Sequence, residues 1–280
     1  MHIIELTQER RAAQDRREGR PRGQAEALAA ALEGGEIEVL FQPQFASATG
    51  RLVGAEALAR WQHPQLGRIG AQDLFADADC AGLAGALAHH VARIALRAAA
   101  AWPAGLQLSL NVTAADLAAE DFPERMAAQI AEAGFPPERL TLEITEESLV
   151  DDVMRSARRL QPMAARGIRI ALDDFGAGFC NFRYLKQLPL NGLKLDRSMV
   201  DGIDEDPRDL AVLRGIMAMA AALGLEVTAE GIERQGQLDA VVREGCAYWQ
   251  GFLASPPVGA AEFVAMAEAA TRPPSASRPS

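Results

Sequence analysis

From Leu106 onward this chain repeats one unit, a short apolar stretch typical of a buried strand, followed in most repeats by a helical pattern. The predicted strands are Leu106–Val112, Leu140–Thr145, Ile168–Asp173, Gly192–Asp196, Leu225–Glu230 and Cys246–Phe252. The predicted helices among them are Phe122–Ala133, Val153–Ala165, Asp209–Leu223, Gln235–Arg243 and Ala260–Ala270. Strands that alternate with helices form a mostly parallel sheet, and this many units favours an α/β fold of the (β/α)8 TIM-like barrel type.

Two further strands are expected before Leu106. Apolar residues alternate over 37–41, which predicts a strand that closes at Gln42-Pro43, and Leu52–Leu58 predicts a second strand after the turn at Gly50. Because their connection is short, the first strand should pair with the second as one antiparallel strand of the barrel. Helical patterns cover Ala25–Leu32, Gln72–Asp79 and Leu83–Trp102.

The barrel is expected to occupy residues 25–270. Residues 1–24 are polar and Arg-rich, which is typical of a solvated helix or linker and equally of a stub that joined this domain to an upstream sensory or regulatory one. Residues 271–280 are rich in Pro and Ser, so we expect a disordered tail.

The predicted strand Ile168–Asp173 ends in two adjacent carboxylates, Asp173 and Asp174, and Gly176 follows at once. Neighbouring anions at the end of a buried strand repel each other and resist desolvation. One Asp could serve as a helix cap, but capping does not require the second. A divalent cation held by oxygen ligands accounts for both.

Polar or charged residues stand at the ends of the other predicted strands as well, and in a barrel these ends converge on one mouth. They are Glu56, Asn111, Glu143, Lys194 with Asp196, Glu230 and Gln250. The set is rich in oxygen donors and contains no His, which favours Mg²⁺ or Mn²⁺ over zinc. Lys194 is the one cation in the set; it could balance charge, or it could orient and help activate a water.

The composition excludes several classes of function. A net charge of −10 argues against binding a nucleic-acid polymer by charge alone, although a small phosphate ligand remains compatible if cations lie between it and the carboxylates. The three cysteines have no CxxC spacing, which fits a reducing cytoplasm and argues against a zinc–thiolate site. The sequence contains no run of about 18 uncharged apolar residues, so we expect no transmembrane helix.

Ordered sequence blocks across most of the chain resemble the EAL-domain family, which hydrolyses the bacterial second messenger cyclic di-GMP. The blocks are EALAR (Glu56–Arg60), WQHP (Trp61–Pro64), NVT (Asn111–Thr113), LEITEE (Leu142–Glu147), DDFG (Asp173–Gly176), LKLDRS (Leu193–Ser198), AEGIE (Ala229–Glu233) and QGF (Gln250–Phe252). A lone EAL tripeptide would carry no weight, but this many blocks in order are highly specific.

The resemblance implies a site for two divalent cations, Mg²⁺ or Mn²⁺. Four residues resemble the ligands of the first cation: Glu56, Asn111, Glu143 and Asp173. Asp173 would bridge to the second cation, which Asp174 and Glu230 would also hold. Lys194, with Gln250 nearby, resembles the residue that holds and polarises the attacking water, and Glu146 resembles a glutamate that anchors the loop after Asp174.

The resemblance also implies the substrate side and the reaction. Arg60 resembles the arginine on a substrate phosphate, Gln42 and Leu58 line the nucleotide side, and Asp196 matches an aspartate of the family's Lys-Ile-Asp block. Two cations can clamp a phosphodiester and stabilise the leaving 3′-oxygen, so that opening one linkage gives linear pGpG. Calcium should occupy the site but inhibit turnover, and a homodimer through the barrel is expected.

The chain departs from the family pattern at positions that are not metal ligands. The family commonly has Thr where this chain has Ala177, and Tyr-Ser-Ser where it has Phe179-Cys180-Asn181. It prefers an aliphatic residue where this chain has Gln44 and Pro where it has Ala71. The altered loop bears on coupling to the second cation and to dimerisation, and therefore on rate and regulation.

Two alternatives to an active phosphodiesterase stay open. The first is a receptor that binds cyclic di-GMP without cutting it, although such relatives usually lose a metal ligand or the lysine, and this chain keeps both. The second is an unrelated metal-dependent barrel enzyme acting on a small acid, which the ordered blocks disfavour.

Overall fold

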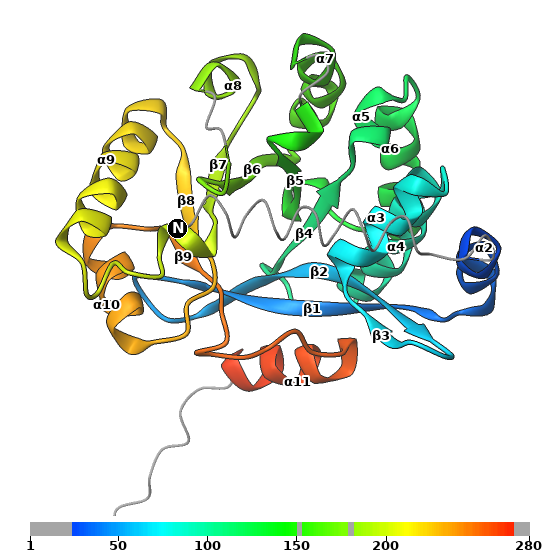
Figure 1. Ribbon diagram of the computed structural model, residues 1–280, viewed down its shortest axis with the longest axis horizontal. Helices are drawn as coiled ribbons and strands as arrows, with labels where there is room; N and C mark the ends of the chain where they lie inside the picture. Colours follow the sequence, from blue (N-terminus) through cyan, green and yellow to red (C-terminus); the bar gives the residue numbers. More distant parts are fainter. Residues whose placement is uncertain (1–23, 150–152, 179–181, 272–280) are drawn as a thin grey trace, which may run out of the picture.

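The computed structural model describes residues 24–149, 153–178 and 182–271. Within these residues eight strands close a ring in the order β1-β2-β4-β5-β6-β7-β8-β9, with β9 returning to β1, and the short β3 extends β2 as a hairpin (Figure 1). The strands are β1 (Ile37–Ala46), β2 (Leu52–His63), β3 (Gly67–Ile69), β4 (Gln107–Val112), β5 (Leu140–Thr145), β6 (Arg169–Phe175), β7 (Gly192–Leu195), β8 (Glu226–Ala229) and β9 (Tyr248–Trp249). The predicted TIM-like barrel is confirmed.

The direction of the first strand is also as expected. From β2 round to β9 every neighbouring pair in the ring is parallel. β1 is antiparallel to both of its neighbours, β2 and β9. Because β1 and β2 are joined by only a tight turn, the chain can return only in the opposite direction.

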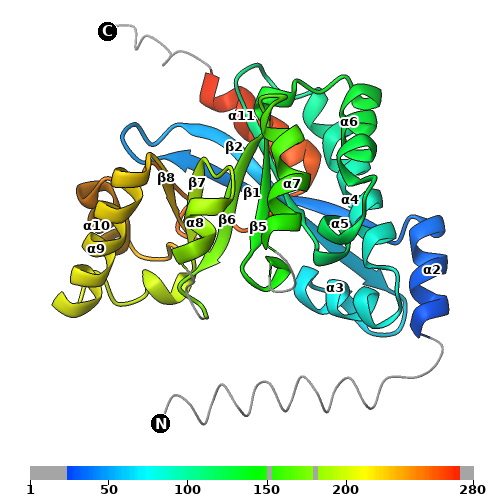
Figure 2. The same cartoon turned by 90° about the horizontal axis from the view of Figure 1, so that it is seen from above.

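Helices surround the strands when the molecule is viewed from above (Figure 2). They are α2 (Gln24–Gly34), α3 (Ala71–Cys80), α4 (Ala84–Ala100), α5 (Ala114–Ala118), α6 (Phe122–Ala133), α7 (Val153–Ala164), α8 (Phe182–Gln187), α9 (Pro207–Leu223), α10 (Gln235–Glu244) and α11 (Ala260–Thr271). α4 shows the cause: Leu87, Val91 and Ala95 recur at helical spacing and are buried on its inner face. α11 covers β1, where Phe263 contacts Phe41 and Trp102.

The prediction that the first strand closes at Pro43 is wrong, because β1 continues to Ala46. The N–H of Phe41 donates to the Val258 carbonyl (2.8 Å), on the side of β1 away from β2. Pro43, two residues later, turns its nitrogen to that same side, and β1 pairs with β9 there only from Phe45 onward. The missing N–H of proline therefore interrupts no ladder.

The last predicted strand, Cys246–Phe252, is shorter than expected, since β9 covers only Tyr248–Trp249. Its end coincides with that of β8, whose last residue Ala229 pairs with Trp249, and Gly251 follows two residues later. A Cβ at this position would lie 2.1 Å from the Ile232 carbonyl oxygen, so the backbone can come this close only as glycine. The backbone beyond Gln250 thus packs directly against that of Ile232.

The two terminal segments are not tested by the structure. The predicted linker, apart from Gln24 at the start of α2, and the predicted tail, apart from Thr271 at the end of α11, lie outside the described residues. Of the helices that the structure describes, none has both the length and the apolarity needed to cross a membrane.

Candidate active site

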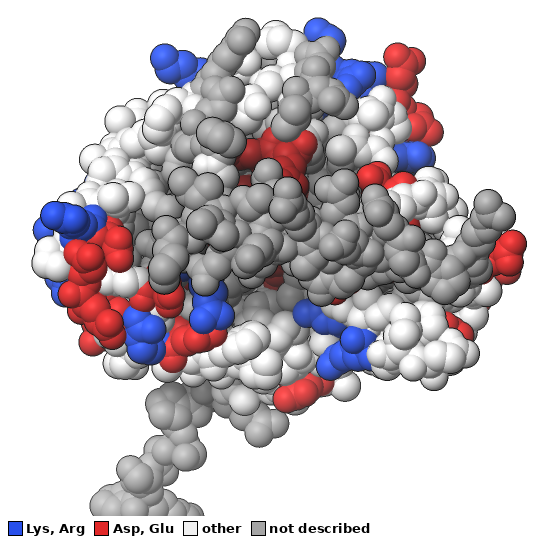
Figure 3. Space-filling view, in the orientation of Figure 1, with Lys and Arg blue, Asp and Glu red and all other residues white. Residues whose placement is uncertain are grey.

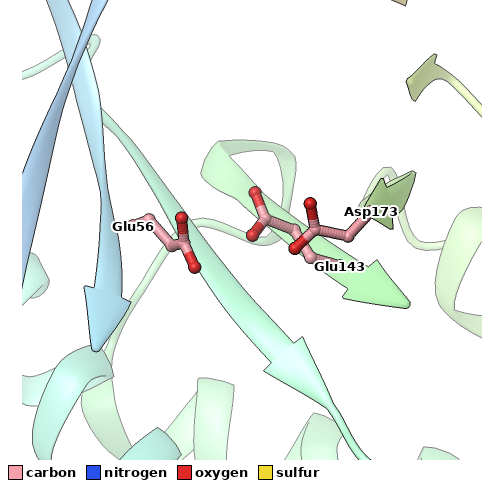
Figure 4. A group of neighbouring side chains, drawn as sticks. All are labelled: Glu56, Glu143 and Asp173. Atoms are coloured by element: carbon pink, nitrogen blue, oxygen red, sulfur yellow. The ribbon is translucent and has the colours of Figure 1, made fainter. Parts of the chain in front are cut away.

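Three acidic side chains from three different strands converge inside the barrel (Figure 4). Glu56 lies on β2, Glu143 on β5 and Asp173 on β6, and each is almost fully buried. Because parallel strands direct their carboxyl ends to the same mouth, residues far apart in the chain meet there. Asn111 on β4 joins them by donating a hydrogen bond from Nδ2 to Glu56 Oε1 (2.9 Å).

A bulge explains how two adjacent aspartates can serve one site. Successive side chains of a regular strand point to opposite faces, but the pairing of β6 with β7 shifts register between Leu172 and Phe175. Asp174 adopts a left-handed conformation there, with φ of 55°, and its N–H donates to Asp173 Oδ1 (2.9 Å). Such bulges re-aim side chains, so Asp174 can join its neighbour at the mouth.

The carboxylates form two groups that share Asp173. One group is Glu56, Glu143 and Asp173; the other is Asp173, Asp174 and Glu230. Within each group one oxygen per residue lies within 4.8 Å of the others. Clustered carboxylate oxygens are the donors that Mg²⁺ and Mn²⁺ prefer, so the residues of each group fit a divalent cation, and Asp173 belongs to both groups.

Lys194 on β7 lies at the centre of this cluster, only 2% exposed. Its Nζ is 2.6 Å from Glu143 Oε2, 2.6 Å from Glu230 Oε1, 3.1 Å from Asp173 Oδ2 and 3.2 Å from Glu56 Oε2. Lys194, which the sequence analysis identified as the one cation of the set, is therefore buried among four carboxylates.

The pKa values record how strongly these groups interact. Burial would lower the pKa of Lys194, but the surrounding carboxylates raise it well above its usual value, so the ammonium stays charged. Burial raises the pKa of Glu143 to about 8, because Glu56 and Asp173 add repulsion that Lys194 only partly offsets. Desolvation and the Asp173 charge raise the pKa of Asp174 to about 6. Without cations, the cluster therefore holds more negative charge than one lysine can compensate.

Gln250, which follows β9, connects both carboxylate groups. Its Nε2 donates to Glu56 Oε2 (2.8 Å) and to Glu230 Oε1 (3.1 Å). On its other side, Gln250 Oε1 accepts a hydrogen bond from Gln44 Nε2 (3.0 Å). Gln44 was not among the predicted site residues. The signal that could have found it is the alternation of Gln42 and Gln44, which places both on the face of β1 that carries Glu56 on β2.

The remaining predicted site residues line one cavity of about 1120 Å³, which Glu56, Asp173 and Glu230 also line. They are Gln42, Leu58, Arg60, Glu146 and Asp196, and Asn111, Asp174 and Gln250 line it as well. In the space-filling view, which has the orientation of Figure 1, acidic side chains are visible over the positions of β5 and β6 (Figure 3). Glu143 and Lys194 line instead a smaller cavity of about 160 Å³.

Local hydrogen bonds hold several of these lining residues. Gln42 Nε2 donates to the Ser255 carbonyl (2.6 Å), and Arg60 Nη1 donates to the Ala59 carbonyl (2.8 Å). The Asp196 carboxylate accepts from the N–H and hydroxyl of Ser198. The loop that Glu146 is predicted to anchor includes residues 179–181, which lie outside the described residues, so this role is untested.

Comparisons with known proteins agree with the geometry. The EAL domain family matches residues 25–257. The cyclic di-GMP phosphodiesterase RocR of Pseudomonas aeruginosa is 32% identical over 236 residues, which is 83% of this chain and 60% of RocR. The bifunctional diguanylate cyclase/cyclic di-GMP phosphodiesterase MucR of the same organism is 32% identical over 242 residues, 85% of this chain and 35% of MucR. The chain thus spans less than two thirds of either relative.

Solved structures give the same result. The MucR phosphodiesterase in complex with c-di-GMP superposes with a TM-score of 0.80 at 31% identity, covering 86% of this chain and 99% of that one. The EAL domain of DcpA from Mycobacterium smegmatis has a TM-score of 0.72 at 31% identity, with the same coverage. The predicted resemblance is confirmed, and the chain belongs to the EAL domain family.

Proposed function

We propose that this chain hydrolyses cyclic di-GMP to linear pGpG with the help of two divalent cations, Mg²⁺ or Mn²⁺. The observation that carries the proposal is that Asp173 belongs to both carboxylate groups while Lys194 contacts members of each. The names of the similar proteins RocR and MucR, both cyclic di-GMP phosphodiesterases, support the choice of substrate.

The metal ligands follow from the two groups. Glu56, Asn111, Glu143 and Asp173 would hold one cation, and Asp173, Asp174 and Glu230 the other. When bound, such cations supply Lewis acidity and charge stabilisation at the phosphodiester. The raised pKa values of Glu143 and Asp174 fit this proposal. Carboxylates that repel one another without cations are stabilised most when cations bind.

The residues of the chain would divide the remaining work. Lys194 would hold the attacking water by its ammonium group, with Gln250 and Glu230 beside it. Water attacks phosphorus, the bond from phosphorus to the 3′-oxygen breaks, and the linear product carries a 5′-phosphate and a 3′-hydroxyl. Arg60 would bind a phosphate of the substrate at the rim, and Gln42, Leu58 and Asp196 would contact the nucleotide.

One assay tests this function. Purified protein is incubated with cyclic di-GMP and Mg²⁺ or Mn²⁺, and the products are separated by chromatography. Appearance of pGpG supports the proposal, whereas binding without product would identify a receptor. In Ca²⁺ we expect little product, because calcium prefers longer and looser coordination and would misplace the reacting groups.

The context of the domain follows from the relatives, which are longer than this chain. A homodimer through the barrel is a prediction from the resemblance. Regulation by an upstream sensory domain or partner is a prediction from residues 1–24, and location in the cytoplasm is a prediction from the cysteine spacing. Sedimentation of the purified protein at several concentrations would test the dimer.

A further inference from the structure

The antiparallel direction of β1 places Gln44 opposite Gln250. β1 pairs with β9 through Phe45 opposite Trp249 and Ala46 opposite Tyr248. Continuing this register by one residue places Gln44 opposite Gln250. Side chains directly opposite each other in an antiparallel pair lie on the same face and are nearest neighbours. The contact between the two amides is therefore a consequence of the fold.

The hydrogen bonds of the Gln250 amide have a fixed direction. Its Nε2 faces the carboxylates of Glu56 and Glu230, and its Oε1 accepts from Gln44 Nε2. Gln44 is 9% exposed and Gln250 6% exposed, so water reaches this contact poorly. Gln44 also lines the smaller cavity, which Glu143 and Lys194 share, whereas Gln250 lines the larger one.

We propose that Gln44 is a positioning residue, which acts through Gln250 to hold Glu56 and Glu230 in the orientation that receives the two cations. The inference rests on the proposed function only in that these carboxylates are taken as metal ligands. Gln44 itself touches neither carboxylate by any hydrogen bond among the described residues, so its effect must pass through the amide of Gln250.

The physical reason is the buried oxygen of Gln250. Without the Gln44 donor, Gln250 Oε1 would lose this hydrogen bond, while Gln250 Nε2 still faced the carboxylates of Glu56 and Glu230. A buried acceptor without a donor is unfavourable, and the amide would shift to find one. The two hydrogen bonds from Nε2 would then lengthen. Partners that orient metal ligands typically change metal affinity or activity 10–100-fold when removed.

The first experiment replaces the donor at constant size. Gln44→Met keeps the length and volume of the side chain and removes the amide. We expect the Kd for Mn²⁺, measured by calorimetry without substrate, to rise about tenfold, at the lower end of that range. kcat for cyclic di-GMP should fall by a similar factor, with a smaller change in KM. Gln107→Met is the matched control, because Gln107 lines the same small cavity, and it should leave both values unchanged.

A double-mutant cycle then separates positioning from packing. If Gln44 acts through Gln250, Gln44→Met should change the Mn²⁺ Kd of a Gln250→Met protein by no more than about twofold. Effects that multiply in the double variant would show that Gln44 acts independently, and an unchanged Kd in the single variant would also overturn the proposal. Should Gln44→Met not fold, Gln44→Leu removes the donor without adding a charge and is held to the same outcomes. Because calorimetry needs no turnover, the result is independent of whether the chain hydrolyses cyclic di-GMP.

Discussion

Replacing Lys194 with Met should separate stability, metal binding and chemistry in one variant. Met has nearly the length of Lys but no charge, so the change removes the ammonium without opening a large cavity. Lys194 Nζ lies within 3.2 Å of four carboxylates, and the side chain is 2% exposed. Without the ammonium group, these four carboxylates would face one another, and no other buried cationic side chain of the described residues contacts them.

The expected loss follows from this burial. Removing one partner of a buried ion pair costs about 3–5 kcal/mol, since the remaining charge is left uncompensated. For a domain of this size that corresponds to a fall in Tm of roughly 10 °C. The loss should be smaller near pH 5 than near pH 8, because the carboxylates can be protonated; the pKa of Glu143 is already raised to about 8 with Lys194 present.

Saturating Mn²⁺ should restore most of this stability, because cations that bind only the folded state stabilise it and here also replace the missing positive charge. Turnover should stay at least about 10²-fold lower, the scale of a positioned proton-handling group, while cyclic di-GMP still binds. Thermal unfolding at two pH values with EDTA or Mn²⁺, together with calorimetry and product chromatography, measures each part. A loss of stability independent of pH and Mn²⁺ would refute the electrostatic argument, and normal turnover would show that Lys194 is dispensable for chemistry.

Four further outcomes are expected. Asp173→Asn should abolish hydrolysis in Mg²⁺ and Mn²⁺ alike, since it weakens both carboxylate groups; near-normal product formation would contradict the bridging role. Arg60→Ala should weaken cyclic di-GMP binding in calorimetry as well as lowering turnover, because it removes a cation from the cavity wall. A chain that starts at Gln24 should keep its Tm and its activity, because Leu28 and Ala31 of α2 already bury the apolar face of that helix. In EDTA, Tm should fall from about pH 5 to pH 8, because raised pKa values such as that of Glu143 mean that the folded state binds more protons than the unfolded state.

The sequence predicted the parts of this site that depend on local pattern. Short apolar runs that carry an acidic residue located β5 and β6, and the barrel rule then placed Glu143 and Asp173 at one mouth. The bulge at Asp174 could not be predicted in the same way, because its cause is a register shift against β7 rather than a preference of Asp itself. Tertiary pairing, which no local pattern contains, decides such a feature.

The continuation of β1 shows the same limit from the other side. Pro43 is normally a reason to end a strand. It is tolerated here because its nitrogen points to the side of β1 away from β2, where β9 pairs with β1 only from Phe45 onward. Those extra residues carry Gln44 into contact with Gln250. A prediction that ends the strand at Pro43 therefore misses both the last part of β1 and the contact between Gln44 and Gln250 that depends on it.

The charge of the cluster connects these features to the need for metal. When all are ionised, Glu56, Glu143, Asp173, Asp174 and Glu230 carry five negative charges, and Lys194 returns one positive charge. The remaining four negative charges match the four positive charges of two divalent cations and exceed those of one. Without cations, protonation relieves part of this excess, in agreement with the raised pKa values of Glu143, Asp173, Asp174 and Glu230. A barrel that served only as a scaffold would gain nothing from holding such a cluster, which supports the proposal that the site works with two cations bound.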